Sequence, residues 1–491
     1  MIARRHFLLA STAAATAAAR STPAPAPYGV VPSPRQLLWH QLEVYSFLHF
    51  TTNTFTDKEW GYGDESPSIF NPSAFDADAI VSALKAGGMT AVILTCKHHD
   101  GFCLWPTRTT SHSVRQSPWR GGQGDVVREL SQAAGRHGLK FGVYLSPWDR
   151  NAAVYGSPEY LTMYREQLRE LLTGYGPVFE VWHDGANGGD GYYGGTREKR
   201  QIDNLTYYDW PRTWELVRSL QPDAVIFSDV GPDIRWVGNE KGIAAETSWA
   251  TYDPVAANGV GAASPGNIRA QDSPAGTRNG KRWLPAECDV SIRPGWFWHE
   301  KENERVKTPR QLMDLYFQSV GRGGSFLLNV PPDRRGLLYE KDVDSLRAFG
   351  AALRGLFAVN LAFGGRWHAA SPVRGKAFAP ANLADGNRDT YWSTADATTT
   401  PSVECRLPGG APARFNVIRL REHLPLGQRI EGIAVDAWQN GAWRELATAA
   451  SVGACRLIQL AEPVTAARVR LRVTQSPVAP ALSEFGLYLR S

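Results

Sequence analysis

Cysteine is scarce in this chain, and no apolar run is long enough to cross a membrane. The five cysteines among 491 residues are too few for a disulfide framework, and no Cys/His spacing matches a structural zinc site. Cys405 and Cys455 both lie in the C-terminal part and could pair, a question that the sequence leaves open. The apolar N-terminal segment is short and rich in Ala and Thr, so we expect no membrane span.

Neither positive nor negative charge is in large excess. The chain has 53 basic and 48 acidic residues, a formal net charge of +5, and no dense Lys/Arg run, so we expect no nucleic-acid partner. Aromatic residues, in contrast, are plentiful, with 17 Trp, 17 Tyr and 19 Phe. Such residues stack on the apolar faces of sugar rings, although a large core also needs them.

The first 27 residues are typical of an export signal and a linker. Arg4-Arg5 precedes Phe7-Leu8, and a run of small residues and a Pro/Ala-rich stretch follow. The paired arginines resemble a twin-arginine signal, which carries folded proteins across a bacterial inner membrane. We therefore predict an exported bacterial protein, periplasmic or secreted.

Residues 28–358 show an alternation of short apolar runs with segments of helical periodicity. The alternation predicts an α/β fold, and a doubly wound sheet would produce the same pattern. A count of eight runs over about 330 residues favours a TIM-like (β/α) barrel. The runs are residues 44–50, 90–96, 140–146, 178–183, 224–229, 244–249, 284–290 and 325–330.

Residues 359–491 lose the helical periodicity and predict a separate all-β domain. The segment from Asn382 to Trp392, which contains Asp385-Gly386-Asn387-Arg388-Asp389, resembles the signature of discoidin-type sandwiches, the group that includes family 32 carbohydrate-binding modules. The resemblance implies a structural calcium near Asp385 and Asp389. An accessory sandwich that binds nothing is the alternative, because a fold alone does not confer function.

Asp184 is the most informative acidic residue of the predicted barrel. It closes the buried run Val181-Trp182-His183, and Gly185 follows at once. Active sites of (β/α) barrels lie at this carboxyl end of the strands. A turn or helix-capping role is the alternative for an isolated Asp.

Further motifs lie at other predicted strand ends. They are His49-Phe50, Lys97-His98-His99-Asp100-Gly101-Phe102, Ser146-Pro147-Trp148-Asp149 and Arg235-Trp236-Val237-Gly238-Asn239-Glu240. Together with Asp184 they resemble glycoside hydrolase family 29, the α-L-fucosidases, over residues 34–358. The resemblance implies that Asp184 is the nucleophile and Glu240 the general acid/base of a retaining glycosidase. Glu246, six residues on, is the alternative acid/base.

The resemblance assigns His49, His98 and His99 to the hydroxyl groups of fucose, since an imidazole can donate at one nitrogen and accept at the other. His98, His99 and Asp100 are also ligand types of a hydrolytic zinc centre. Neighbouring residues on an extended chain point apart, which argues against a shared ion. We therefore expect no metal or organic cofactor in the reaction.

The loop that contains Trp60 and Glu65 resembles the branch of family 29 that acts on α-1,3 and α-1,4 fucosyl linkages. In that branch Glu65 would bind the neighbouring galactose of a Lewis-type oligosaccharide. Trp148 belongs to a motif that indicates the same branch. Tyr144 and Trp298 are candidates for the wall around the fucose methyl group or the acceptor sugar, with core packing as the alternative.

The resulting prediction is a retaining exo-α-L-fucosidase that acts on fucosylated oligosaccharides or glycoconjugates. Two alternatives remain. One is a non-catalytic fucose-binding protein, and the other is a glycosidase for a related deoxy- or galacto-configured sugar.

Overall fold

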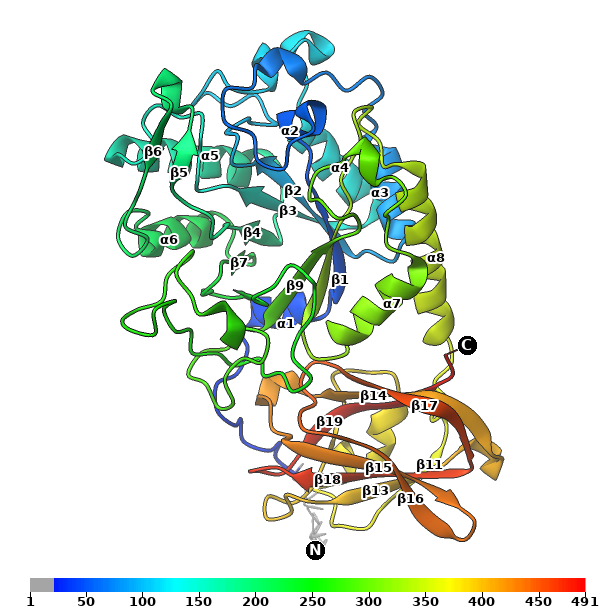
Figure 1. Ribbon diagram of the computed structural model, residues 1–491. Coiled ribbons are helices and arrows are strands. Elements are labelled where there is room, and N and C mark those ends of the chain that lie inside the picture. The colour runs from blue at the N-terminus through cyan, green and yellow to red at the C-terminus, as the bar shows by residue number, and fades with distance from the viewer. Residues whose placement is uncertain (1–21, 491) are drawn as a thin grey trace, which may run out of the picture.

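The structure, a computed structural model, describes residues 22–490 and consists of a barrel followed by antiparallel sheets (Figure 1). Most of the predicted export signal, residues 1–21, lies outside the described residues. Within residues 22–490, no helix is both long and apolar enough to cross a bilayer.

Eight parallel strands form the barrel. Their order is β7-β4-β3-β2-β1-β10-β9-β8, and a parallel bridge between Phe227 and Ile234 brings β7 close to β8, so the barrel is nearly closed. This confirms the predicted TIM-like fold. The strands are β1 (Val44–Leu48), β2 (Ala91–Lys97), β3 (Lys140–Leu145), β4 (Glu180–Trp182), β7 (Val225–Phe227), β8 (Arg235–Trp236), β9 (Ala286–Ser291) and β10 (Ser325–Asn329).

The predicted sixth strand, residues 244–249, is wrong. The sixth strand is β8, where Arg235 pairs with Ala286 of β9. The later run is apolar because it is packed, not because it is extended in the sheet. Ala244 is buried with Val237 in a small cluster, and the N–H of Ala250 donates to the Gln428 side chain at 2.9 Å.

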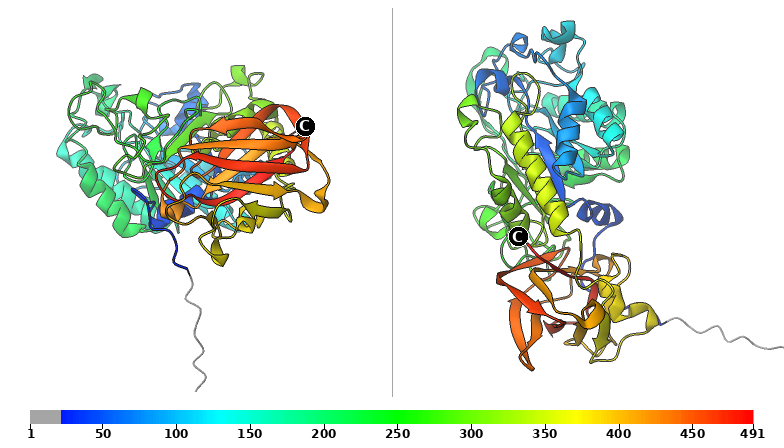
Figure 2. Two further views of the ribbon diagram at one scale, coloured as in Figure 1. Left: turned by 90° about the horizontal axis from the view of Figure 1, so that it is seen from below. Right: turned by 90° about the vertical axis from the view of Figure 1, so that its right-hand side faces the viewer.

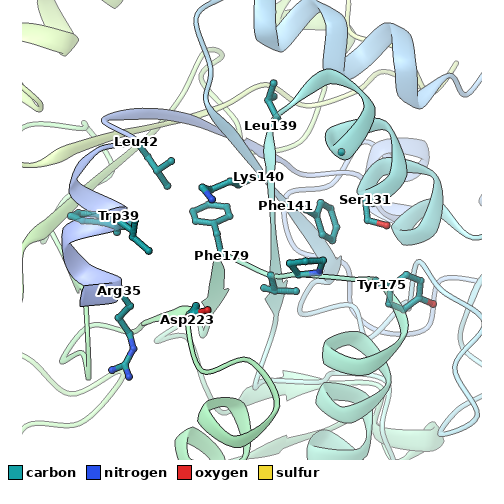
Figure 3. A pocket seen from close by; sticks show the side chains of 14 residues that line it. Arg35, Trp39, Leu42, Ser131, Leu139, Lys140, Phe141, Tyr175, Phe179 and Asp223 are labelled. Carbon is teal, nitrogen blue, oxygen red and sulfur yellow. The ribbon is translucent and has the colours of Figure 1, made fainter. Parts of the chain in front are cut away.

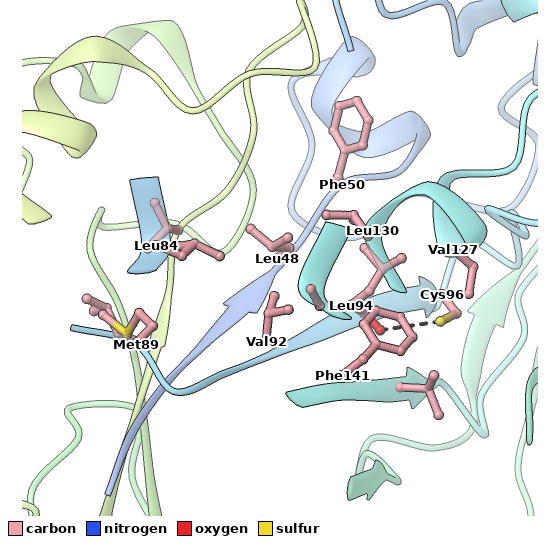
Figure 4. Packing of buried hydrophobic residues seen from close by; sticks show 14 of the residues in the cluster. Leu48, Phe50, Leu84, Met89, Val92, Leu94, Cys96, Val127, Leu130 and Phe141 are labelled. Carbon is pink, nitrogen blue, oxygen red and sulfur yellow. Dashed lines mark hydrogen bonds between the residues drawn. The ribbon is translucent and has the colours of Figure 1, made fainter. Parts of the chain in front are cut away.

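Helices cover the outside of the barrel. In α4 (Val126–His137), the Asp125 side chain accepts the Arg128 N–H at 2.9 Å, and the helix ends at Gly138 in the left-handed region. Its buried face packs on β2 and β3, where Leu130 lies near Leu94 (Figure 4). The other helices are α1 (Pro34–His40), α2 (Thr52–Thr56), α3 (Ala77–Ala86), α5 (Pro158–Gly174), α6 (Trp210–Leu220), α7 (Pro309–Gln318) and α8 (Glu340–Leu356).

Two antiparallel sheets follow α8, and we call them the C-terminal sandwich. Their orders are β11-β13-β18-β15-β16 and β12-β19-β14-β17. Buried side chains such as Trp392, Phe415 and Phe485 form the core of the sandwich. These sheets confirm the predicted all-β C-terminal part. The strands are β11 (Arg366–Ala369), β12 (Trp392–Ser393), β13 (Ser402–Arg406), β14 (Ala413–Glu422), β15 (Gly432–Gln439), β16 (Ala442–Ala449), β17 (Arg456–Ala466), β18 (Arg468–Gln475) and β19 (Ala481–Tyr488).

The sandwich packs against the amino ends of the barrel strands (Figures 1 and 2). Glu43, the residue before β1, pairs with Arg388 and Arg421, each at 2.6 Å. The backbone N–H of Leu457 donates to the carbonyl of Gly321, which shortly precedes β10. The sandwich is therefore remote from the carboxyl ends of the strands.

A cavity of about 400 Å³ opens at the amino ends of β3 and β4, beside α1 (Figure 3). Trp39, Phe141 and Phe179 contribute apolar walls, and Arg35 and Asp223 also line it. Because Asp184 follows the carboxyl end of β4, this cavity is not the predicted catalytic site.

The Asp-Gly-Asn loop of the sandwich is a hydrogen-bonded turn. One oxygen of Asp385 accepts the Asn387 N–H at 2.8 Å, and the other accepts the Thr390 hydroxyl at 2.6 Å. Asp389 is exposed, and residues 22–490 contain no group of three or more His, Cys, Asp or Glu side chains suited to a metal ion. A calcium near Asp385 and Asp389 stays a prediction.

All five cysteines lie in the described part of the chain, and all are free and buried. Cys405 packs in the core of the sandwich, whereas Cys455 belongs to the large cluster that includes the barrel. The pairing that the sequence left open is absent.

Candidate active site

Asp184 lies two residues beyond β4, and two donors hold its carboxylate. Its Oδ2 accepts the Tyr144 hydroxyl at 2.8 Å, and its Oδ1 accepts the Ala186 N–H at 2.7 Å. Burial, followed by the Asp184 charge, raises the pKa of Tyr144 well above its usual value, so this phenol keeps its proton and donates. The side chain of Asp184 is 23% exposed, so a substrate can reach a carboxylate whose orientation is already set.

His49, whose ring lies 6.0 Å from that of Tyr144, presents an acceptor nitrogen. Its Nδ1 lies 2.8 Å from Oδ1 of Asn329, and the Asn329 NH₂ group donates to Ser291 Oγ and to the Trp296 carbonyl. Those two donations fix which amide atom is the oxygen, so His49 must donate from Nδ1. Burial lowers the pKa of His49 to about 3, so the ring is neutral and Nε2 is free to accept a hydroxyl proton.

His99 has the same tautomer by a similar argument. Ser146 Oγ donates to the Trp148 carbonyl at 2.6 Å and therefore accepts from His99 Nδ1 at 2.7 Å. Burial lowers the pKa of His99 to about 4, although the Asp184 charge opposes the shift. The deprotonated Nε2 lies 3.9 Å from Asp184 Oδ2, where a hydroxyl group of a ligand could donate to either atom.

His98 completes the histidine cluster. Its ring lies 4.1 Å from that of His99 and 5.5 Å from that of His49, centroid to centroid. Burial lowers its pKa well below the ordinary value, and its buried Nδ1 has no partner among residues 22–490. The structure therefore brings the three predicted histidines together as neutral, partly unpaired polar groups.

Asp100 does not join them in a metal site. Its Oδ2 accepts the Thr51 hydroxyl at 2.6 Å, and its Oδ1 accepts the Phe102 N–H at 2.7 Å. Both carboxylate oxygens are thus engaged by protein donors, so this donor set does not fit the zinc alternative.

Aromatic rings surround the cluster. Trp60 lies 5.1 Å from the His99 ring and 5.6 Å from the Trp148 ring, edge-on in both cases, and it is 52% exposed. Trp148 is buried and donates to the Tyr193 hydroxyl at 2.9 Å. Trp60 is therefore the ring that an incoming oligosaccharide can reach.

Trp298, which the sequence suggested as a wall residue, does not make the contacts of its neighbours. Trp296 lies 5.2 Å from the His49 ring, and Phe297 lies 5.1 Å from the His98 ring. Trp298 is buried instead near the Arg334 guanidinium, 5.7 Å away. The cluster of three aromatic residues is visible in the sequence, but the loop geometry selects which members face the histidines.

Glu240 follows β8 on a tight turn. Gly238 has φ +87°, and a β-carbon there would lie 2.2 Å from the Ala270 carbonyl oxygen, so the turn requires glycine. Desolvation of the carboxyl raises the pKa of Glu240; a hydrogen bond from Trp296 opposes the shift, and the charges of Asp184 and Glu59 add to it. Glu240 is thus close enough to Asp184 to feel its charge, and its environment favours the protonated acid.

Glu246, the alternative acid/base, lies elsewhere. Its carboxylate pairs with Arg322 at 2.8 Å and with Arg456 of β17. These contacts place it against the C-terminal sandwich, at the opposite end of the barrel from Asp184.

Glu65 points into its own loop. Its carboxylate accepts the N–H groups of Tyr62 and Gly63 and the Lys58 ammonium, each at 2.8 Å, and its side chain is 2% exposed. A contact with galactose would require this loop to open. In the described conformation, Glu65 shapes the loop that presents Trp60.

Asp229 is a site residue that the sequence analysis missed. It is buried beside Asp184, and burial, together with the Asp184 charge, raises its pKa to about 6 despite a hydrogen bond from Gly266. The signal was available, because Asp229 is the last residue of a predicted strand run, residues 224–229.

Comparisons with known proteins identify the family of this chain. The sequence profile of the family described as alpha-L-fucosidase matches residues 28–355. Alpha-L-fucosidase 1 of Arabidopsis thaliana is 41% identical over 474 residues, which cover 95% of this chain and 89% of the plant protein.

Solved structures show the same similarity. A glycoside hydrolase 29 family member from an unknown rumen bacterium is 40% identical, with a TM-score of 0.83, over 95% of this chain and 78% of that chain. A Ruminococcus gnavus GH29 fucosidase in complex with fucose is 32% identical, with a TM-score of 0.84, over 96% and 97% of the two chains. The predicted family resemblance and enzyme class are confirmed: the chain belongs to the α-L-fucosidase family of glycoside hydrolases.

Proposed function

We propose that this chain is a retaining exo-α-L-fucosidase in which Asp184 is the nucleophile and Glu240 the acid/base. The observation that carries the proposal is the opposite environment of the two carboxyl groups. Asp184 accepts two hydrogen bonds and is partly exposed to solvent, whereas desolvation raises the pKa of Glu240 and favours its acid form. A retaining glycosidase needs this division between nucleophile and proton donor.

In the first step, an oxygen of Asp184 attacks the anomeric carbon of fucose. The bond between that carbon and the glycosidic oxygen breaks, and Glu240 transfers its proton to the departing oxygen. The products are a fucosyl ester of Asp184, the freed hydroxyl of the leaving sugar and a Glu240 carboxylate.

In the second step, Glu240 removes a proton from water, and the water oxygen attacks the anomeric carbon. The ester bond to Asp184 breaks, which releases fucose and returns both carboxyl groups to their starting states. Tyr144 donates to Asp184 Oδ2 and therefore stabilises the carboxylate as it leaves.

The neutral histidines supply recognition of the sugar hydroxyls. His49 and His99 each hold Nδ1–H in a protein hydrogen bond and offer Nε2 as an acceptor. The His98 ring lies 4.1 Å from that of His99 and 5.5 Å from that of His49. Three such groups around Asp184 suit a ring with several free hydroxyls.

The linkage preference that we propose is α-1,3/1,4, on branched Lewis-type glycans. Exposed Trp60 is the residue that would contact the sugars beyond fucose, and Glu65 would act through the shape of the Trp60 loop. We also propose that the protein is exported by the predicted twin-arginine signal, and that the C-terminal sandwich is a discoidin-type accessory module.

The decisive experiment measures fucose release from a Lewis-type branched trisaccharide and, in parallel, from α-1,2-fucosylated lactose. Release from the branched sugar alone supports both activity and linkage, whereas release from both removes the linkage preference. Asp184→Ala should abolish release, and near-normal activity of that variant would remove the proposed nucleophile. Binding without release would favour a fucose-binding protein, and preferential cleavage of aryl galactosides would favour a related sugar.

A further inference from the structure

A second cavity, of about 490 Å³, lies where the end of α8 meets the C-terminal sandwich. Its walls come from residues 357–363, from the loop at residues 384–388, and from strands β14 and β19. It lies at the junction with the sandwich, at the amino ends of the barrel strands, so it is separate from the site around Asp184. Its volume is within the range of about 300–1,000 Å³ that is common for small-molecule sites.

Two large apolar side chains of this cavity face solvent. Val359 is 66% exposed and Phe363 is 63% exposed. Both lie on the short connection between α8 and β11, where either could have turned into the adjoining cores. An exposed aromatic ring beside polar groups suits the apolar face of a sugar ring.

The polar wall of the cavity belongs to a network of three arginines and two glutamates. Arg419 donates to Glu484 at 2.6 Å, and Arg421 donates to the other oxygen of Glu484 at 2.8 Å. Glu43 pairs with Arg421 and with Arg388, each at 2.6 Å. Of these residues, Arg388, Arg419 and Glu484 line the cavity, so its wall has two positively charged groups and one negatively charged group.

This imbalance persists over a wide pH range. Although burial opposes it, the surrounding arginines, Arg421 foremost, lower the pKa of Glu43 to about 2. Arg419 and Arg421 likewise lower the pKa of Glu484 against the effect of burial. Both glutamates are therefore ionised and already engaged.

Arg388 is the arginine that remains available. One of its NH₂ groups binds Glu43, and 43% of its side chain is exposed at the cavity. Beside it, Asn387 uses Oδ1 to accept the Asp389 N–H at 3.0 Å, which directs its NH₂ group to other partners. The acidic neighbours Asp385 and Asp389 do not line this cavity.

We propose that this cavity binds a carboxylate-bearing sugar unit. The carboxylate lies on the Arg388 guanidinium and the Asn387 amide, and the apolar face of the ring lies on Phe363. A guanidinium matches a carboxylate through two parallel N–H donors, and here it also balances the surplus charge of the wall. The inference takes the class of ligand, a sugar, from the proposed function, while the charge and the contacts come from the cavity itself.

The experiment measures binding of α-2,3-sialyllactose to the full chain, by saturation-transfer NMR and titration calorimetry, with lactose as the neutral probe. Neither probe carries fucose, so hydrolysis does not interfere. Wild type should bind sialyllactose and not lactose. Because a charge-assisted hydrogen bond contributes about 1.5–3 kcal/mol, Arg388→Gln should weaken binding at least about tenfold.

Phe363→Ala removes only an exposed ring and should weaken binding by a similar factor. This variant is needed because Arg388→Gln also breaks the ion pair with Glu43 and could weaken binding through that loss alone. Arg444→Gln, at an exposed arginine of β16, is the matched control and should bind as wild type does. All three variants should keep wild-type hydrolysis of an aryl fucoside.

Three results would overturn the proposal: no binding of sialyllactose by wild type, equal binding of lactose, or normal binding by both cavity variants. The two hypotheses fail separately. Intact aryl-fucoside hydrolysis without sialyllactose binding refutes only the cavity, and intact binding without hydrolysis refutes only the proposed reaction.

Discussion

Asp229 and Asp184 occupy equivalent positions on neighbouring strands. Trp182 of β4 is in register with Phe227 of β7, and each aspartate comes two residues after its member of that pair. A β-carbon at Gly185 would lie only 2.2 Å from Asp229 Oδ2, and the same oxygen accepts the Gly266 N–H at 2.7 Å. Asp229 therefore supports the loop of the nucleophile and ties it to the long connection between β8 and β9, which also contains Glu240.

Removal of the Asp229 side chain should impair catalysis without loss of the fold. We expect Asp229→Ala to lower kcat/KM about 10- to 100-fold, because small displacements of reacting groups cost rates of this order. Asp229→Asn keeps an acceptor for the Gly266 N–H and should lose less. Steady-state kinetics on an aryl fucoside, with thermal unfolding as a check of the fold, would test this.

The pH dependence of kcat/KM distinguishes a positioning role of Asp229 from a purely structural one. Asp229 has a pKa of about 6, so in wild type it gains a proton as the pH falls through 6. Any component of the kcat/KM profile near pH 6 that belongs to this group should disappear in Asp229→Asn. An unchanged profile together with unchanged kcat/KM would show that Asp229 does not position the nucleophile loop.

Glu240 and Glu246 form a matched pair of variants. Glu240→Ala should lose activity on natural glycosides and regain it with azide on an activated aryl fucoside. Since desolvation raises the pKa of Glu240, wild-type activity should fall as rising pH removes this proton, and the variant should lack that alkaline limb. Glu246→Ala removes ion pairs with Arg322 and Arg456 and should leave the rate on aryl fucosides unchanged. The reverse pattern would transfer the acid/base role to Glu246.

Trp60 should affect the leaving sugars and not fucose itself. Trp60→Ala is expected to raise KM for a branched trisaccharide several-fold, because stacking on an aromatic ring contributes about 0.5–1.5 kcal/mol. The kcat/KM for an aryl fucoside should change far less. Glu65→Gln weakens the contacts of this side chain with Lys58 and with two backbone N–H groups of the loop. Its kinetic effects should therefore resemble those of Trp60→Ala. Equal losses on both substrates would assign Trp60 to the fucose subsite.

A pair of buried acids inside the barrel links stability to pH. Glu180 on β4 and Glu287 on β9 are fully buried, and Glu287 also accepts from Trp182 Nε1 at 2.6 Å. Burial, followed by the Glu287 charge, raises the pKa of Glu180 well above 4.5. The stability contribution of such a group is complete below the unfolded-state pKa and is lost as the pH rises toward the folded-state pKa.

The stability of Glu180→Gln relative to wild type should therefore increase as the pH rises above 4.5. Between the unfolded and folded pKa values, the difference in unfolding free energy should grow by about 1.4 kcal/mol per pH unit. Urea unfolding at pH 5 and pH 7.5 measures it. A difference that stays constant between those pH values would show that Glu180 does not hold a proton in the folded barrel.

Local sequence signals were sufficient for much of the fold and for the position of Asp184. Helices α5 (Pro158–Gly174) and α6 (Trp210–Leu220) have strong apolar periodicity and proline at their first turns, so their bounds follow from the sequence. Asp184 was predictable because a buried run ends in an acid followed by glycine. In each case the signal lies within a few residues of the feature.

Contacts between distant residues decided the rest. The run at 244–249 resembles a strand because burial of Ala244 in a loop beside Val237 and burial in a strand both favour apolar residues. The sequence offers Glu246 as an alternative to Glu240, and only the tertiary structure shows that Glu246 pairs with Arg322 and Arg456, away from Asp184. The sequence by itself thus determined the family, the barrel and the acid at the end of β4, because those depend on local pattern. The direction of the Glu65 side chain, the place of Asp229 and the positive cavity beside α8 depend on which distant chain segments meet, and only the tertiary structure decided them.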